Sequence, residues 1–239
     1  ALNAGKHVVC EKPLANTVAE AETMVAAANA NKNLKNMVAF NYRRVPAVSL
    51  AKKMVEEGKI GRIFHIRARY LQDWIVDPNF PLVWRLEKDK AGSGALGDIG
   101  AHAIDTTQFV TGQKLIGVSG ITETFIKERP LPGDYSGLQA SASGNKMGKV
   151  TVDDAAVFIG KTDGGALATY EATRFAPGRK NDMGFEIFGS KGKLMCHTVW
   201  QHENDEALLT LTTDTEGVKN EHIKKANHFE LEINHFNQC

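Results

Sequence analysis

Two patterns of hydrophobic and polar residues divide the chain. Near its start, short apolar runs at 7–11 and 37–40 flank an alanine-rich segment at 18–30. The apolar runs predict two buried strands, and the alanine-rich segment predicts a helix that begins with a capping box of Thr17 and Glu20. A strand, a helix and a strand in this order predict a parallel, right-handed βαβ unit.

The rest of the chain combines helical segments with stretches in which apolar and polar residues alternate. Helices are predicted at 46–57 and 101–110, and the start of a third at 227–236. Alternation of apolar and polar residues predicts strands of a mostly antiparallel sheet, at 63–70, 116–126, 151–160, 166–174, 185–188 and 208–213, with hairpin turns at 162–165 and 189–192.

These elements predict an α/β fold in two parts. Residues 1–45 form a partial Rossmann-like βαβ unit, and residues 46–239 form an α+β domain with a large open, mostly antiparallel sheet. The segment 130–148 is rich in glycine, serine and proline, so we expect a mobile loop there.

The composition limits the classes of partner. Hydrophobic residues make up 42% of the 239 residues and charged residues 24%, with a net charge of +1, so the charge balance implies no nucleic-acid partner. No apolar run approaches the length of a membrane span. Cys10, Cys196 and Cys239 form no CxxC pair, which predicts a reducing, cytoplasmic compartment and no zinc site. Residues 1–6 are typical of the last turn of a helix, so we expect the native N-terminus to lie upstream.

The candidate chemistry centres on a glycine-rich loop at 92–100 that leads into the helix predicted at 101–110. Asp98 and His102 are four positions apart, so in a helix they share one face. A carboxylate beside an imidazole is suited to general acid–base catalysis, and the helix N-terminus disfavours the imidazolium form. Two simpler interpretations stay open: Asp98 as an N-cap, and His102 as a core histidine. Asp105 is interpreted as structural.

Polar residues follow both strands of the βαβ unit. Glu11 and Lys12 end the first strand before Pro13, and Asn41 and Arg43 follow the second. Ligands of open parallel sheets gather at the carboxyl ends of the strands, so we expect these side chains near a ligand.

The segment 72–90 has no regular pattern and contains Trp74, Trp84 and Arg85. A long irregular loop within a compact domain is more often a binding element than a linker. We therefore expect this loop to serve the site that follows it in the sequence.

Three segments resemble one family. Residues 4–14 read AGKHVVCEKPL, residues 41–44 read NYRR and residues 97–105 read GDIGAHAID. They are similar to the E-K-P, N-x-R-aromatic and G-D-x-G-x-H-x-x-D segments of the Gfo/Idh/MocA family of NAD(P)-dependent sugar and polyol dehydrogenases, although Arg44 replaces the aromatic residue. The resemblance covers essentially the whole chain. The G-x-G-x-x-G segment with which family members open is not among these residues, so the resemblance implies a chain truncated at its N-terminus.

The resemblance implies hydride transfer between NAD or NADP and a hydroxyl group of a sugar, a cyclic polyol or a sugar derivative. It implies that Lys12 contacts the nicotinamide ribose and the reacting hydroxyl, that His102 is the general base and that Asp98 orients it. Tyr42, Tyr70, Arg43 and Arg174 are further candidates for substrate contact. The cofactor contacts that it implies are Glu11, Lys12, Pro13, Asn41, Arg43, Trp84 and Arg85.

The partners expected from this interpretation are a small sugar or polyol substrate and further copies of the chain. A homo-oligomer, a dimer or tetramer, is expected through the face of the sheet that no helix covers; neither nucleic acid, nor a membrane, nor a metal is expected. Two alternatives stay open. One is a truncated, cofactor-free sugar-binding or structural remnant of such an enzyme, and the other is a lyase or hydrolase that uses bound NAD transiently.

Overall fold

The computed structural model describes residues 1–136, 139–199, 206–224 and 226–239, and the chain forms two compact units. The first unit comprises Ala1–Val45 and Ala226–Cys239, and the second comprises Pro46–Lys225. The expectation of one domain over 46–239 is therefore wrong at its C-terminal end. Helix α5 (His228–Gln238) belongs to the first unit because it packs on the short helix η2 (Asn41–Arg44), where the rings of Tyr42 and His228 lie 5.7 Å apart.

The first unit contains the predicted βαβ arrangement. Strands β1 (Val8–Glu11) and β2 (Asn36–Ala39) pair in parallel, and α1 (Val18–Ala30) connects them. The capping box is confirmed, since the Thr17 hydroxyl accepts the Glu20 N–H and the Glu20 carboxylate accepts the Thr17 N–H. A short 3-10 helix, η1 (Leu2–Ala4), precedes β1.

One side of this unit is an apolar groove of about 410 Å³. It is lined by alanines and by Met24 and Val25 of α1, by Val8 and Cys10 of β1, and by Met37 of β2. Helix α1 buries none of its residues, so its apolar side faces this groove rather than a closed core.

The described residues of the second unit form an eight-stranded sheet in the order β12-β11-β10-β9-β3-β8-β7-β4. The pair β3–β8 is parallel, and the other neighbours are antiparallel, which confirms the predicted sheet type. The strands are β3 (Ile63–Leu71), β4 (Leu115–Glu123), β7 (Ala155–Thr162), β8 (Leu167–Thr173), β9 (Asp182–Gly189), β10 (Gly192–Val199), β11 (Glu206–Thr213) and β12 (Gly217–Lys224).

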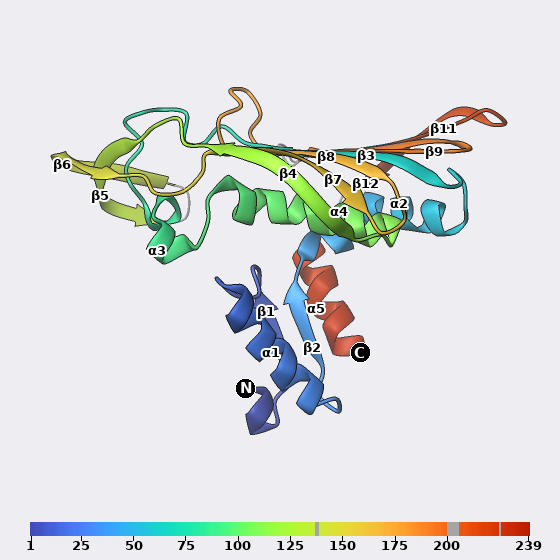
Figure 1. Ribbon diagram of the computed structural model, residues 1–239, viewed down its shortest axis with the longest axis horizontal. Helices are drawn as coiled ribbons and strands as arrows, with labels where there is room; N and C mark the ends of the chain where they lie inside the picture. Colours follow the sequence, from blue (N-terminus) through green and yellow to red (C-terminus); the bar gives the residue numbers. More distant parts are fainter. Residues whose placement is uncertain (137–138, 200–205, 225) are drawn as a thin grey trace. The chain divides into compact units, whose positions relative to one another are not determined.

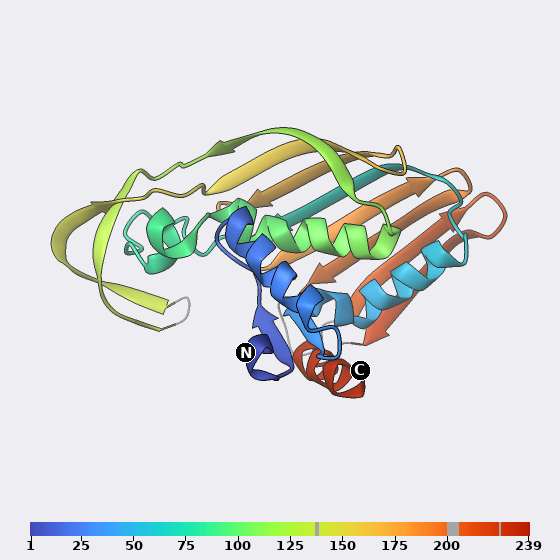
Figure 2. The ribbon, with the colours of Figure 1, turned by 60° about the horizontal axis from the view of Figure 1, so that its bottom comes forward.

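Helices α2 (Pro46–Glu56) and α4 (Ala101–Thr111) lie side by side on one face of this sheet (Figures 1 and 2). The buried residues of β3, β7 and β8 point to that face, among them Ile66, Phe158 and Tyr170. In the described part of the chain, no helix covers the opposite face (Figure 1). None of the helices described is long and apolar enough to cross a membrane.

The expectation of a mobile loop at 130–148 is wrong. Most of it forms the antiparallel ribbon of β5 (Glu128–Ser136) and β6 (Gln139–Lys149), while residues 137–138 lie outside the described part. In a two-stranded ribbon each strand has one unpaired edge, so Pro130 and Pro132, which lack an N–H, can be accommodated. The register of the ribbon shifts on both sides of Pro132. Strand β12 also escapes prediction, since it is exposed along nearly its whole length and so carries no alternating pattern.

Candidate functional site

The glycine-rich loop leads into a single helical segment. It starts as a π-helix, η4 (Leu96–Gly100), and continues directly as α4. The Asp153 carboxylate caps its start: Oδ1 accepts the Gly94 N–H at 2.9 Å and Oδ2 accepts the Leu96 N–H at 2.7 Å. A side chain on Gly94 would collide with the Asp153 carbonyl, because a Cβ there would lie 1.8 Å from that oxygen. The glycine therefore permits the close approach of the two segments.

Asp98 is not a helix N-cap: it lies within η4, and the N-cap positions of η4 and α4 are Ala95 and Gly100. Its Oδ2 instead accepts a hydrogen bond from Nη2 of Arg174 at 2.8 Å. The Arg174 side chain is 1% exposed and that of Asp98 is 33% exposed. The pair thus joins a buried cation to a carboxylate that partly reaches the surface.

His102 is buried, with 7% of its surface exposed, and it lies one turn after Asp98 on the same continuous helical segment. Because that segment begins at Leu96, His102 lies beyond its first turn. The expected effect of the helix N-terminus on the imidazole is therefore small, since this effect fades within one turn. The ring of Tyr70, at the end of β3, lies 6.2 Å from the His102 ring.

A chain of polar contacts connects Tyr70 to the loop that follows β3. The Tyr70 hydroxyl donates to Oδ1 of Asn181 at 2.7 Å, and Nε2 of Gln72 donates to the same oxygen at 2.8 Å. The indole N–H of Trp74 donates to Oε1 of Gln72 at 3.0 Å. The Trp74 ring also lies 5.3 Å from the Arg174 guanidinium carbon, so this loop contacts the residue that holds Asp98.

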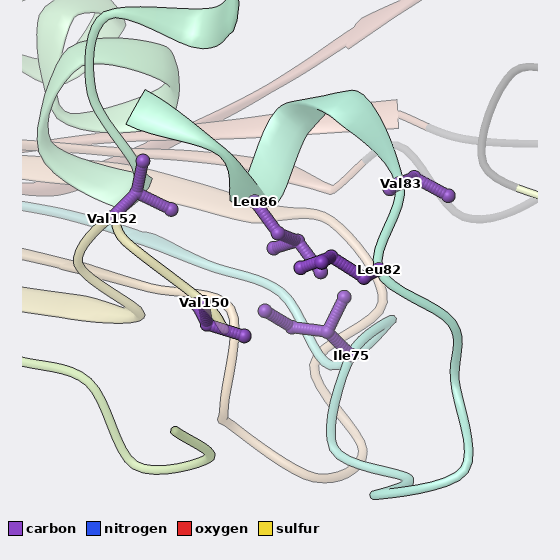
Figure 3. Packing of buried hydrophobic residues seen from close by; sticks show 6 residues of the cluster. All are labelled: Ile75, Leu82, Val83, Leu86, Val150 and Val152. Carbon is purple, nitrogen blue, oxygen red and sulfur yellow. The ribbon is translucent and has the colours of Figure 1, made fainter. Parts of the chain in front are cut away.

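The irregular loop has a hydrophobic core of its own, formed by Ile75, Leu82, Val83, Leu86, Val150 and Val152 (Figure 3). The buried side chain of Arg129 donates hydrogen bonds to the backbone carbonyls of Ile75, Asp77 and Phe80 in this loop. The shape of the loop is thereby fixed from within the second unit.

A second carboxylate, Asp154, is buried beside this loop. Its Oδ2 accepts the backbone N–H groups of Phe125 and Ile126. Burial raises the pKa of Asp154 above its usual value, while these two hydrogen bonds and the charges of Arg129 and Arg174 partly oppose the shift.

Trp84 and Arg85 lie in the short helix η3 (Trp84–Leu86), just before α3 (Lys88–Ala91). Trp84 is 39% exposed, and the Arg85 guanidinium lies 4.4 Å from its ring centroid. Among the described contacts, the two residues pair with each other rather than with Asp98 or His102.

The other candidates form a separate group in the first unit. Glu11 pairs with Ala39 across the parallel strands, so Lys12 and the residues after β2 lie at the same edge of that sheet. Asn41 is buried, and the Arg43 guanidinium lies 5.6 Å from the Phe40 ring. Lys12, Pro13, Asn41 and Arg43 thus gather at the carboxyl ends of β1 and β2, as the sequence predicts.

The sequence missed four residues that shape the site: Gln72, Arg129, Asp153 and Asn181. The pair Asp153-Asp154, two carboxylates directly before a strand, is a signal that could have been noticed. Among the described residues, no cluster of three His, Cys, Asp or Glu side chains could hold a metal ion.

Comparison with known proteins places this geometry in a family. Residues 48–195 match the GFO/IDH/MocA C-terminal domain, and residues 1–40 match the oxidoreductase family NAD-binding Rossmann fold. The chain is 46% identical over 222 residues to levoglucosan dehydrogenase of Pseudarthrobacter phenanthrenivorans, covering 92% of this chain and 56% of that protein.

Two solved structures are similar. One is an oxidoreductase domain protein from Kribbella flavida, with a TM-score of 0.83 and 56% identity over 93% of this chain and 57% of that chain. The other is levoglucosan dehydrogenase in complex with NADH and L-sorbose, with a TM-score of 0.81 and 42% identity over 93% and 56%. The chain spans a little over half the length of these relatives. By its matched domains and this identity, the chain belongs to the GFO/IDH/MocA family of oxidoreductases.

Proposed function

We propose that the chain takes part in the NAD(P)-linked oxidation of a hydroxyl group on a sugar, a cyclic polyol or a sugar derivative. The observation that carries the proposal is the helical segment of η4 and α4, which presents Asp98 and His102 one turn apart, with Asp98 held by Arg174. The relative named levoglucosan dehydrogenase favours an anhydrosugar as the first substrate to test.

In this proposal His102 is the general base. Its imidazole takes the proton of the substrate hydroxyl as the carbon–hydrogen bond breaks. Asp98 orients the imidazole or the substrate, because its carboxylate is fixed on one side by Arg174 and one third of its side chain remains exposed. The Tyr70 ring beside His102 limits the water around the imidazole.

NAD or NADP supplies the hydride acceptor when bound. The first unit fits its nicotinamide half, because a parallel βαβ unit brings Glu11, Lys12, Pro13, Asn41 and Arg43 to one sheet edge. An ammonium such as that of Lys12 favours the alkoxide form of a hydroxyl that it contacts, and so the loss of hydride. The half-buried Arg85, whose guanidinium lies over the Trp84 ring, is suited to a cofactor phosphate.

The test is a nicotinamide absorbance assay of the purified chain with NAD or NADP and levoglucosan, L-sorbose and inositols. We expect His102→Asn to lower kcat by about 10²- to 10⁴-fold. His222→Asn, on the exposed strand β12, is the matched control and should keep the wild-type rate.

Calorimetry with NAD and with each sugar decides between the proposal and its main alternative. Sugar binding without NAD binding or turnover would favour a cofactor-free sugar-binding remnant. Turnover unchanged in His102→Asn would remove His102 as the base.

We also propose that a second copy of the chain covers the open face of the sheet. Apolar Val157 and Ile159 are exposed on that face, where Arg67 pairs with Glu186 and Arg69 pairs with Glu171 across neighbouring strands. A face that carries both signs of charge around apolar side chains is self-complementary under a two-fold axis.

Light scattering after size exclusion tests the dimer. Val157→Asp should shift the wild-type oligomer towards monomer, whereas Val118→Asp should not. Val118 is a matched control because it is also exposed but pairs with Gly160, on the helix-covered face. A monomeric wild type, at concentrations well above those of the assay, would contradict the proposal.

A further inference from the structure

Among its described residues, the second unit contains two fully buried arginines, Arg129 and Arg174, and they are held in different ways. Arg129 donates from Nη1 and Nη2 to three backbone carbonyls, as expected of a residue that fixes a loop, and its Nε alone is buried without an acceptor among the described residues. Arg174 donates to described acceptors from Nη2 alone. This nitrogen lies 2.8 Å from Asp98 Oδ2 and 3.4 Å from the Gly94 carbonyl oxygen. The Nε and Nη1 of Arg174 are buried without an acceptor among the described residues.

That arrangement is costly for an arginine that only stabilises the fold. A buried donor without an acceptor costs about 1–3 kcal/mol, and a buried charge needs a counter-charge. Among the described residues, Asp98 supplies the carboxylate within ion-pair distance of Arg174. Residues that keep such a cost are found most often at functional sites, where geometry matters more than stability.

The position of Arg174 is itself well determined. It directly follows β8, and its backbone N–H donates to the Asp154 carbonyl at 3.0 Å. The Trp74 ring lies 5.3 Å from its guanidinium carbon, and the charge-assisted bond to Asp98 fixes the other end. A rigid cation of this kind limits the directions that the Asp98 carboxylate can take.

The same nitrogen reaches the glycine loop through the Gly94 carbonyl. Arg174 therefore ties two points of one segment, the loop before η4 and the carboxylate within η4. The π-helical turn places Asp98 where an α-helix would not, and π-turns are frequent at functional sites.

We propose that Arg174 is a positioning residue for the oxidation reaction: its guanidinium fixes the Asp98 carboxylate in the orientation that His102 and the substrate require. The proposal rests on the proposed oxidoreductase function. It predicts that Arg174 acts through Asp98, and that a lysine replaces it only in part because a single ammonium lacks the planar fork.

The kinetic test is a double-mutant cycle on the full chain with Arg174→Met and Asp98→Asn, using levoglucosan and NAD. Arg174→Met should lower kcat by about 10- to 100-fold, with the KM for NAD unchanged, as expected when a reacting group is misplaced. In the Asp98→Asn background the same change should have little further effect, and Arg174→Lys should recover part of the rate. Additive losses in the cycle, or an unchanged kcat in Arg174→Met, would overturn the proposal.

Arg179→Met is the matched control. Its Nη1 also donates to a carboxylate at 2.8 Å, that of Asp182, but Arg179 is exposed and lies outside the segment of Asp98 and His102. It should leave kcat unchanged.

Crystal structures of the wild type and Arg174→Met provide a readout that needs no activity. The Asp98 carboxylate should turn away from its wild-type direction in the variant, and an unmoved carboxylate would overturn the proposal even in an active enzyme. If the wild type oxidises no sugar of the panel while Asp98 does move, the oxidoreductase function fails, and what stands is that Arg174 sets the orientation of the Asp98 carboxylate.

Discussion

The Oδ2 atom of Asp153 accepts the backbone N–H of Leu96 at 2.7 Å, so a residue 57 positions later in the chain caps the helical segment of Asp98 and His102. This carboxylate replaces the local N-cap that the sequence suggested at Asp98.

We expect Asp153→Ala to lower the free energy of unfolding by about 1–3 kcal/mol, because two N–H groups at the start of η4 lose an ionised acceptor. Asp153→Asn keeps one acceptor oxygen and should lose less. Urea denaturation measures both, with Asp214→Ala in an exposed turn as the control. Equal stability of Asp153→Ala and wild type would show that the cap is not needed.

Gly94→Ala should destabilise the protein by about 2 kcal/mol or more, because its Cβ would overlap the Asp153 carbonyl and push η4 away. Gly117→Ala in β4 is the control, since nothing lies within 4 Å of a Cβ there. Thermal unfolding compares the two variants. A Gly94→Ala protein as stable as Gly117→Ala would mean that the loop moves freely aside.

Arg129→Met should release the loop after β3, because the carbonyls of Ile75, Asp77 and Phe80 would lose a shared buried donor. Each unsatisfied buried carbonyl costs about 1–3 kcal/mol, although relaxation of the loop recovers part of this. Hydrogen exchange should show lost protection of the Leu82 amide, which donates to the Pro130 carbonyl at 2.7 Å. Unchanged protection there would contradict the anchoring role.

His197 should make the protein less stable in mild acid. Burial lowers the pKa of His197, and the Arg69 guanidinium, 3.0 Å from Nδ1, lowers it further, while Asp182 and Glu186 partly oppose this. The unfolded chain takes up a proton near pH 6.5, but folded His197 does so only at a lower pH, so stability is lost as the pH falls through this window.

The difference in unfolding free energy between wild type and His197→Asn isolates this effect. As the pH is lowered from about 7.5 towards 5, the unfolding free energy of the wild type should fall relative to that of His197→Asn. A difference that is constant, or that moves in favour of the wild type in acid, would show that the pKa of His197 is not lowered.

The sequence by itself determined the elements whose signals are local. The capping box of Thr17 and Glu20 fixed the start of α1, because both partners lie within one turn. The alternation at 63–70 and 166–174 identified β3 and β8, since one face of each is buried. The i, i+4 spacing of Asp98 and His102 likewise placed both on one helical segment.

Only the tertiary structure decided what surrounds those residues. Arg174 lies 76 positions from Asp98, and Asn181 lies 111 positions from Tyr70. Such contacts depend on the parallel pairing of β3 with β8 and on the loop core around Ile75, which no spacing in the sequence encodes. The ribbon of β5 and β6 escaped prediction for a related reason. Its strands pair with each other and carry prolines and glycines in place of an alternating apolar face, so they leave no periodic hydrophobic signal.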